Sequence, residues 1–296
     1  MTFQGTEAAF EGFRVVRRNP STILFWGLAY MAFFVLFFGL FGGSLATLMA
    51  TAQQAETSQP SQQELEALGL SYLTFMAVVV PLSLVFGAVL NAAVARSVLT
   101  PADKRWGYLR LGADEMRVVA VSVILGLVFL VGTMIAFGLV GILAGLAGAA
   151  NAGLGILVGV VLGLAALAGL IWAAVRLSLA VPMTVHEKRI APFASFALTK
   201  THFWPLLGMA IIAVIMSLLV SLLGTIIALP ISMMTGGGLE VLADLDGQST
   251  LQILQVAGVG LTAWAVVNSI MSALQLAVLY APFSAAYRDL KGLPHE

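Results

Sequence analysis

The chain has no cysteine and only three histidines among its 296 residues. Without cysteine, neither a disulfide nor a thiolate metal site is possible. Metal-assisted hydrolysis relies on clustered histidine and carboxylate side chains, but His186, His202 and His295 are scattered along the sequence. His-Glu-x-x-His and Gly-x-Ser-x-Gly patterns are also missing. We therefore expect no catalytic residues, no metal site and no cofactor, and an enzyme is the least favoured function.

Charged residues make up only 9% of the sequence, against about 25% in ordinary soluble domains. Hydrophobic residues make up 60%, and the mean hydropathy is +1.02. The apolar runs exceed the roughly 20 residues that cross a bilayer, and they lack the alternation of a membrane β-barrel. Because backbone polar groups inside lipid must be paired within the segment, these runs predict helices. The expected fold is an all-α integral membrane protein, a single domain over 1–296, with six transmembrane helices at about 21–50, 70–98, 117–148, 153–181, 204–235 and 250–283.

The first apolar run follows a basic segment, as in a secretory signal peptide. It extends over about 30 residues, whereas the apolar part of a signal peptide has only about 7–15. We therefore interpret it as a retained signal-anchor helix. Cleavage at the small residues near Ala50 and Ala52 is the alternative.

Lysine and arginine are absent from the first, third and fifth loops between successive spans. All 14 of them lie in the N-terminal segment, in two internal basic segments at 96–117 and 182–203, in the C-terminal segment, or at adjoining span ends. Because short loops rich in Lys and Arg are retained on the cytoplasmic side, this distribution predicts that both termini are cytoplasmic.

The third and fourth spans are rich in glycine, and the loop between them is short and uncharged. Residues four apart share a helix face, and glycine there lets two backbones approach closely. The pattern predicts a tight helical hairpin in which the close contacts are made by Gly141, Gly145, Gly155, Gly159 and Gly163. A glycine-rich ligand loop is the alternative, but no strand precedes it and no phosphate-binding lysine follows.

Three segments before a span share a pattern, in which an aromatic residue is followed by apolar and then mostly basic residues. Phe13, Tyr108 and Phe196 take the same place in it, 95 and 88 residues apart. The pattern predicts three structural repeats around a pseudo-threefold axis, each an interfacial elbow helix followed by a hairpin, at 1–98, 99–182 and 183–296. The alternative is that any cytoplasmic segment before a span is amphipathic and basic.

Two stretches resemble a known group of proteins. Residues 193–208, FASFALTKTHFWPLLG, are similar to a Ser-x-x-Leu-Thr-(Lys/Arg)-x-x-Phe/Trp signature, and residues 282–290, PFSAAYRDL, to an ending in Tyr-Arg-Asp-Leu. Both resemble a group of bacterial inner-membrane proteins similar to the membrane domain attached to some glycerophosphoryl diester phosphodiesterases. The resemblance implies a bacterial inner membrane and little chemistry, since the catalytic domain of those phosphodiesterases has no counterpart here.

The cytoplasmic segments carry the candidate binding residues. Each cation near the surface contributes about 1 kcal/mol to the attraction of anionic lipid. The candidates for headgroup binding or partner docking are Arg14, Arg17, Arg18, Lys104, Arg105, Arg110, Lys188, Arg189 and Lys200. The aromatic residues expected at the headgroup layer are Phe10, Phe13, Trp106, Tyr108, Phe196 and Trp204. Phe3, Phe10 and Phe13 also have the spacing of an amphipathic helix lying in the interface.

Polar residues within the spans are few: Asn91, Arg96, Arg176, Asn268 and Gln275. The two arginines lie near cytoplasmic span ends, where their side chains are expected to reach up to the headgroups. The amides are expected to form interhelical hydrogen bonds of about 0.6 kcal/mol each. No carboxylate lies in the middle of a span, which disfavours proton-coupled transport.

Two functions remain. The first is a non-enzymatic membrane scaffold or accessory protein, which organises lipid or a protein partner through the basic elbows on its cytoplasmic face. The second is a small permease or lipid-handling transporter. Membrane lipids, chiefly anionic ones, are the expected partners, and nucleic acid is not. A polar cavity between the spans would favour the transporter, and a filled Gly/Ala/Leu interior would favour the scaffold.

Overall fold

The computed structural model describes residues 4–57, 61–234 and 250–294, which form helices and connecting segments without a strand. Within these residues, six helices are long and apolar enough to cross a membrane. They are α3 (Pro20–Thr57), α4 (Gln62–Leu99), α5 (Ala113–Ala150), α6 (Ala152–Leu177), α9 (Phe203–Met234) and α10 (Thr250–Lys291). The predicted class, an all-α membrane protein with six spans, is confirmed.

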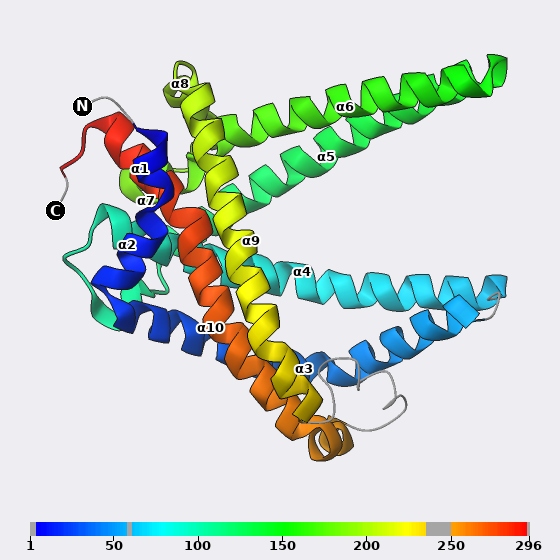
Figure 1. Cartoon of the computed structure of the whole chain (residues 1–296), viewed down its shortest axis with the longest axis horizontal. Coiled ribbons are helices and arrows are strands. Elements are labelled where there is room, and N and C mark those ends of the chain that lie inside the picture. Colours follow the sequence, from blue (N-terminus) through cyan, green and yellow to red (C-terminus); the bar gives the residue numbers. More distant parts are fainter. Residues whose placement is uncertain (1–3, 58–60, 235–249, 295–296) are drawn as a thin grey trace.

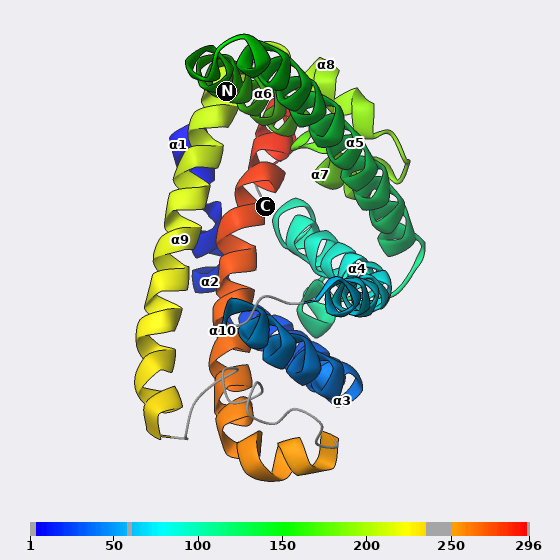
Figure 2. The same cartoon turned by 90° about the vertical axis from the view of Figure 1, so that its right-hand side faces the viewer.

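The long helices form three hairpins, α3–α4, α5–α6 and α9–α10, which diverge from a common region near both ends of the chain (Figure 1). We call this region the base. It consists of the adjoining ends of the long helices and the short elements α1 (Gly5–Ala9), α2 (Glu11–Arg18), η1 (Arg105–Tyr108), α7 (Ala180–Glu187), η2 (Pro192–Ala194) and α8 (Ser195–Thr199). Figure 2 shows the hairpins separating from one another away from the base.

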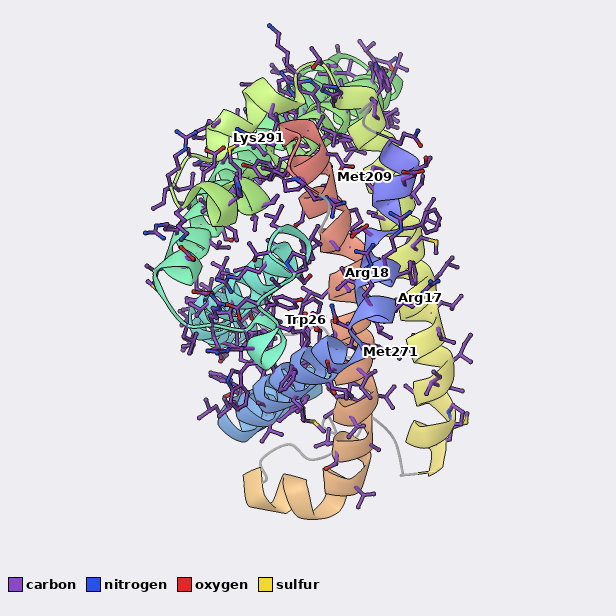
Figure 3. The ribbon with its side chains drawn as sticks, turned by 90° about the vertical axis from the view of Figure 1, so that its left-hand side faces the viewer. Arg17, Arg18, Trp26, Met209, Met271 and Lys291 are labelled. Atoms are coloured by element: carbon purple, nitrogen blue, oxygen red, sulfur yellow. The ribbon has the colours of Figure 1, made fainter. Side chains whose placement is uncertain are left out.

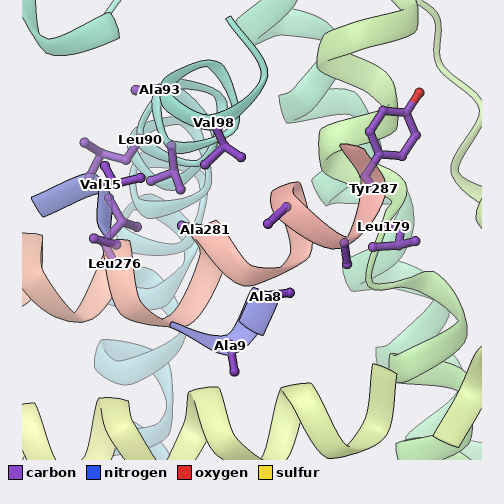
Figure 4. Packing of buried hydrophobic residues seen from close by; sticks show 14 of the residues in the cluster. Ala8, Ala9, Val15, Leu90, Ala93, Val98, Leu179, Leu276, Ala281 and Tyr287 are labelled. Atoms are coloured by element: carbon purple, nitrogen blue, oxygen red, sulfur yellow. The ribbon is translucent and has the colours of Figure 1, made fainter. Parts of the chain in front are cut away.

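The hydrophobic core lies in the base and is centred on α10, which packs against α2, α3, α4 and α9. Buried side chains from short and long elements meet there, among them Trp26, Leu90, Tyr108, Leu206 and Tyr287; Leu90 and Tyr287 are labelled in Figure 4. Farther out, the hairpins expose apolar side chains, as at Ile156 and Leu164 of α6. Such continuous apolar surface suits contact with lipid.

Helix α10 extends beyond the predicted end of the sixth span. We expected the span to end near 283, but the helix continues to Lys291. The residues Ala285, Ala286 and Tyr287 on this last part are buried in the core. The small side chains of the alanines let the helix end pack tightly into the base, so that the C-terminal segment is a structural element.

The elbow of the second predicted repeat is not an α-helix. Trp106, Gly107 and Tyr108 have φ angles of 51°, 62° and 64°, so the backbone forms a short turn in the left-handed region. A Cβ at Gly107 would also lie 2.7 Å from the Cβ of Phe25, which only glycine avoids. The first and third elbows do contain short α-helices, α2 and α8. The threefold repeat itself stays a prediction.

The α5–α6 hairpin is tight at its tip, and two of the five expected glycines lie in the contact. A Cβ at Gly155 would lie 2.6 Å from the Cα of Gly148, and one at Gly159 would lie 3.4 Å from the Cβ of Ala144. Asn151 caps α6 by accepting a hydrogen bond from the backbone N–H of Leu154 at 3.2 Å. Around the other three expected glycines, Gly141, Gly145 and Gly163, an added Cβ would meet nothing within 4 Å, so the close contact is confined to the tip.

Gly12 holds α2 directly against the backbone of α10. A Cβ at this position would lie 2.5 Å from both the carbonyl oxygen of Ala277 and the Cα of Val278. Because these are backbone atoms of a central helix, they do not yield easily. We expect Gly12→Ala to lower the free energy of unfolding by about 1–3 kcal/mol.

The matched control is Gly39→Ala on α3, where an added Cβ meets nothing within 4 Å. This change is expected to be neutral or to stabilise the helix by up to about 1 kcal/mol. Unfolding by SDS in mixed detergent micelles measures both values. Equal effects of the two substitutions would contradict the close contact between α2 and α10.

Candidate functional site

A buried carboxylate joins α2 to the end of α10. Glu11 is only 2% exposed. Its oxygens lie 3.3 Å from Nη1 of Arg14, 3.8 Å from Nη1 of Arg18 and 3.7 Å from Nη1 of Arg288. The group borders a hollow of about 170 Å³. Sequence analysis did not single out Glu11, although its spacing of three and seven residues from Arg14 and Arg18 places all three on one helix face.

Arg96 and Glu115 form a second buried charge pair, which connects α4 to α5. Nη2 of Arg96 binds Oε1 of Glu115, and Nη1 donates a hydrogen bond to the carbonyl of Tyr108 at 2.9 Å. The prediction that Arg96 reaches up to the headgroups was therefore wrong. Its side chain turns inward because Glu115, 19 residues away, provides a buried partner.

Arg96 of this pair and Trp26 together hold the turn at η1. Trp26 of α3, labelled in Figure 3, donates a hydrogen bond from Nε1 to the carbonyl of Gly107 at 2.8 Å. Tyr108 was predicted to lie at the headgroup layer, but it is 1% exposed and its hydroxyl donates to the carbonyl of Pro101 at 3.0 Å. The left-handed backbone turns its ring into the core, while Trp106 beside it is 73% exposed.

Arg176 is also held by the protein instead of reaching freely to the headgroups. Its guanidinium lies 5.6 Å from the ring centre of Trp172 and 5.4 Å from that of Phe196, a cation–π arrangement. Its carbonyl accepts hydrogen bonds from Oγ of Ser195 at 2.7 Å and Oγ1 of Thr199 at 3.2 Å. Thus the Ser and Thr of the 193–208 stretch attach α8 to the end of α6.

The Tyr-Arg pair of the C-terminal stretch is likewise structural. The hydroxyl of Tyr287 donates to Oε1 of Glu187 at 3.2 Å and lies 3.1 Å from Nδ1 of His186. Nζ of Lys291 lies 3.0 Å from Oε1 of Glu187, and Arg288 pairs with Glu11. The two stretches that resemble a protein group therefore connect α8 to α6, and α10 to α2 and α7, at the base.

The nine predicted cations separate into two sets. Arg14 and Arg18 pair with Glu11, Arg110 with Asp103, and Arg189 with Glu187. The other five are exposed and form no ion pair within the part of the chain that the structure describes: Arg17, Lys104, Arg105, Lys188 and Lys200. Figure 3 labels Arg17 and Arg18. This second set is the candidate for binding.

The predicted aromatic residues also differ in exposure. Trp106 and Trp204 are the most exposed, and Phe10 and Phe13 are partly so. Phe196 is half-buried against Arg176, and Phe3 lies outside the described residues. Exposed tryptophans beside free cations are typical of a headgroup layer.

A hollow of about 480 Å³ lies between α2 and the segment that follows α4. Two cations, Arg18 and Lys104, line it together with Asn19 and Ser97. Its walls contain no carboxylate, and guanidinium, ammonium and amide groups are the donors that bind phosphate. We call this hollow with the neighbouring Arg105 and Trp106 the cationic surface.

The polar residues within the spans differ in their hydrogen bonding. Asn268 was expected to bond between helices, but its Nδ2 donates to the carbonyl of Trp264 in its own helix at 3.0 Å. Oδ1 of Asn91 is buried without a hydrogen-bond partner. Gln275 lines a hollow between α3, α9 and α10. No cluster of three or more His, Asp or Glu side chains able to hold a metal occurs among the described residues.

The fold and the base define a helical membrane protein whose described residues include six helices able to span a membrane. No protein-family model matches the chain, and the curated proteins and the solved structures contain no match either. Its function is therefore argued from its own residues.

Proposed function

We propose that this protein is a non-enzymatic scaffold of the bacterial inner membrane, with both termini cytoplasmic. It holds anionic lipid at the cationic surface, and it presents this lipid to a protein partner or together with one. The carrying observation is the hollow lined by Arg18 and Lys104 without a carboxylate in its walls. Arg105 and the exposed ring of Trp106 follow directly on Lys104, so charge and an interfacial aromatic are adjacent.

The paired charges of the base support this role. Glu11 and Glu115 form ion pairs with arginines within the protein. These ion pairs help to hold the segments of the base together. Lys104 and Arg105 form no ion pair among the described residues, so their charge is available to lipid phosphates, whereas Arg18 also lies 3.8 Å from Glu11. The resemblance of 193–208 and 282–290 to bacterial inner-membrane proteins is consistent with the location that we propose.

The test compares two double variants of equal net charge. Lys104→Gln with Arg105→Gln removes two free cations, whereas Arg117→Gln with Lys291→Gln removes two that are already paired, at 2.5 Å with Asp114 and 3.0 Å with Glu187. At about 1 kcal/mol per free cation, the first variant is expected to lose on the order of 30-fold in affinity for phosphatidylglycerol.

Native mass spectrometry with titrated phosphatidylglycerol measures the retention of lipid. The control is expected to remain within about twofold of the unmodified protein, because its arginine and lysine are already neutralised. Equal retention by both variants would refute the cationic surface as a lipid site.

A lipid-handling transporter is the second candidate function. One observation favours it, which is the hollow lined by Gln275 and four further polar side chains between helices that are apolar enough to span a membrane. A scaffold alone needs no such hollow.

A further inference from the structure

A second hollow, of about 160 Å³, lies between three of the long helices. Tyr30 of α3 and Ser217 of α9 line it, together with Ser272, Gln275, Leu276, Leu279 and Tyr280 of α10. On α10, the steps from 272 to 275, 276 and 279 are three, four and seven residues, so these side chains share one helix face. Five hydrogen-bonding groups from three helices thus converge on one hollow.

All seven lining residues lie within helices that are long and apolar enough to cross a membrane, at Pro20–Leu45, Phe203–Pro230 and Gly258–Lys291. Leu276 belongs to the core of the base, and Tyr30 packs against that core. The hollow therefore lies where these spans join the base. In apolar surroundings, polar groups left unpaired are costly.

Within the described chain, none of these five polar side chains forms a hydrogen bond with another part of the protein. Elsewhere in the same helices, polar side chains bond to their own backbone. Ser269 donates to a carbonyl three residues earlier at 2.8 Å, and Asn268 and Thr225 donate to carbonyls four residues earlier at 3.0 and 3.2 Å. Internal bonding is the usual arrangement for such residues. Ser272 and Gln275, on the next turn of α10, leave that capacity free and face the hollow.

We propose that this hollow binds the uncharged polar group of a neutral lipid, with diacylglycerol as the representative of the class. No Lys, Arg, His, Asp or Glu lines it, so a charged headgroup inside it would lack a counter-ion. Hydroxyl and amide side chains instead match the hydroxyl and ester groups of a glyceride. The volume has room for several water-sized groups and not for a whole lipid, and acyl chains would extend past Leu276 and Leu279 into the membrane.

This site is independent of the cationic surface, because no residue is common to both hollows. The two are distinguished by the charge of the lipid. Dioctanoylglycerol and dioctanoyl phosphatidic acid have the same acyl chains, and only the second has a phosphate. They are therefore matched probes for the neutral and the anionic site.

The experiment measures the rise in Tm of the detergent-solubilised protein with each probe. The double variant Ser272→Ala with Gln275→Leu removes two of the polar groups. The control, Ser269→Ala with Asn268→Leu, makes similar changes at residues that bond to their own helix. We expect dioctanoylglycerol to raise Tm in the unmodified protein and in the control. The Ser272/Gln275 variant should need at least tenfold more probe for the same rise.

Phosphatidic acid should act equally on the Ser272/Gln275 variant and the unmodified protein. The single change Ser217→Ala on α9 repeats the test should the double variant fail to fold. Absence of a Tm rise with dioctanoylglycerol in the unmodified protein would overturn the proposal. So would an equal rise in the Ser272/Gln275 variant and in Ser217→Ala, since the probe would then bind outside the hollow.

Discussion

Replacing Glu115 with alanine is expected to lower the free energy of unfolding by about 3–5 kcal/mol. The substitution leaves the guanidinium of Arg96, itself only 5% exposed, as an unpaired charge in the core of the base. Arg96 also holds the carbonyl of Tyr108, so the segment at η1 should loosen as well. Unfolding by SDS in mixed micelles, followed by tryptophan fluorescence, measures the loss.

Two comparisons make this prediction specific. Asp114→Ala removes the neighbouring carboxylate, whose pair with Arg117 is partly exposed, and should cost at most about 1 kcal/mol. The double change Arg96→Met with Glu115→Leu removes both charges and should recover most of the loss. A loss for Glu115→Ala no larger than for Asp114→Ala would argue against a buried pair.

Trp26→Ala is the second substitution for which we expect a large effect, again about 3–5 kcal/mol. The indole is fully buried in the core of the base, and its Nε1–H is the hydrogen-bond donor to the carbonyl of Gly107. The substitution leaves a large cavity and an unpaired carbonyl. Trp26→Phe fills most of the cavity and should cost about 1–3 kcal/mol for the lost hydrogen bond.

Trp106→Ala is the matched control for Trp26→Ala. Its ring is exposed, with an edge contact to Phe25 at 6.0 Å between ring centres, so the loss should be about 1 kcal/mol or less. The same unfolding assay applies. If Trp106→Ala proved as damaging as Trp26→Ala, the assignment of Trp26 to the core would be wrong.

Trp26 and Arg96 bind adjacent carbonyls, those of Gly107 and Tyr108. Residues that hold one segment jointly are not expected to contribute additively. The long basic segment at 96–117 resembles a simple surface loop in sequence. These two hydrogen bonds anchor it to α3 and α4. The anchoring also fixes where Lys104 and Arg105 of the cationic surface lie.

The neutral-lipid site could be predicted from the sequence only in part. Gln275 was recognised as a polar residue within a span, but Tyr30, Ser217, Ser272 and Tyr280 were not. Isolated serines in a transmembrane helix usually bond to their own backbone, and one sequence does not distinguish Ser269, which does so, from Ser272, which does not. Their convergence depends on how α3, α9 and α10 pack together.

The sequence by itself determined the six spans and the sorting of lysine and arginine to one end of the hairpins, because a helix in lipid must be apolar and satisfy its own backbone, whatever its neighbours. Only the tertiary structure decided which charges are free. Arg14 and Arg17 lie on the same short helix, yet Arg14 pairs with buried Glu11 and Arg17 is exposed. The partner of Glu11 on α10, Arg288, comes from the far end of the chain. Ion pairs and hollows depend on distances between such segments, and these distances arise only when the hairpins meet at the base.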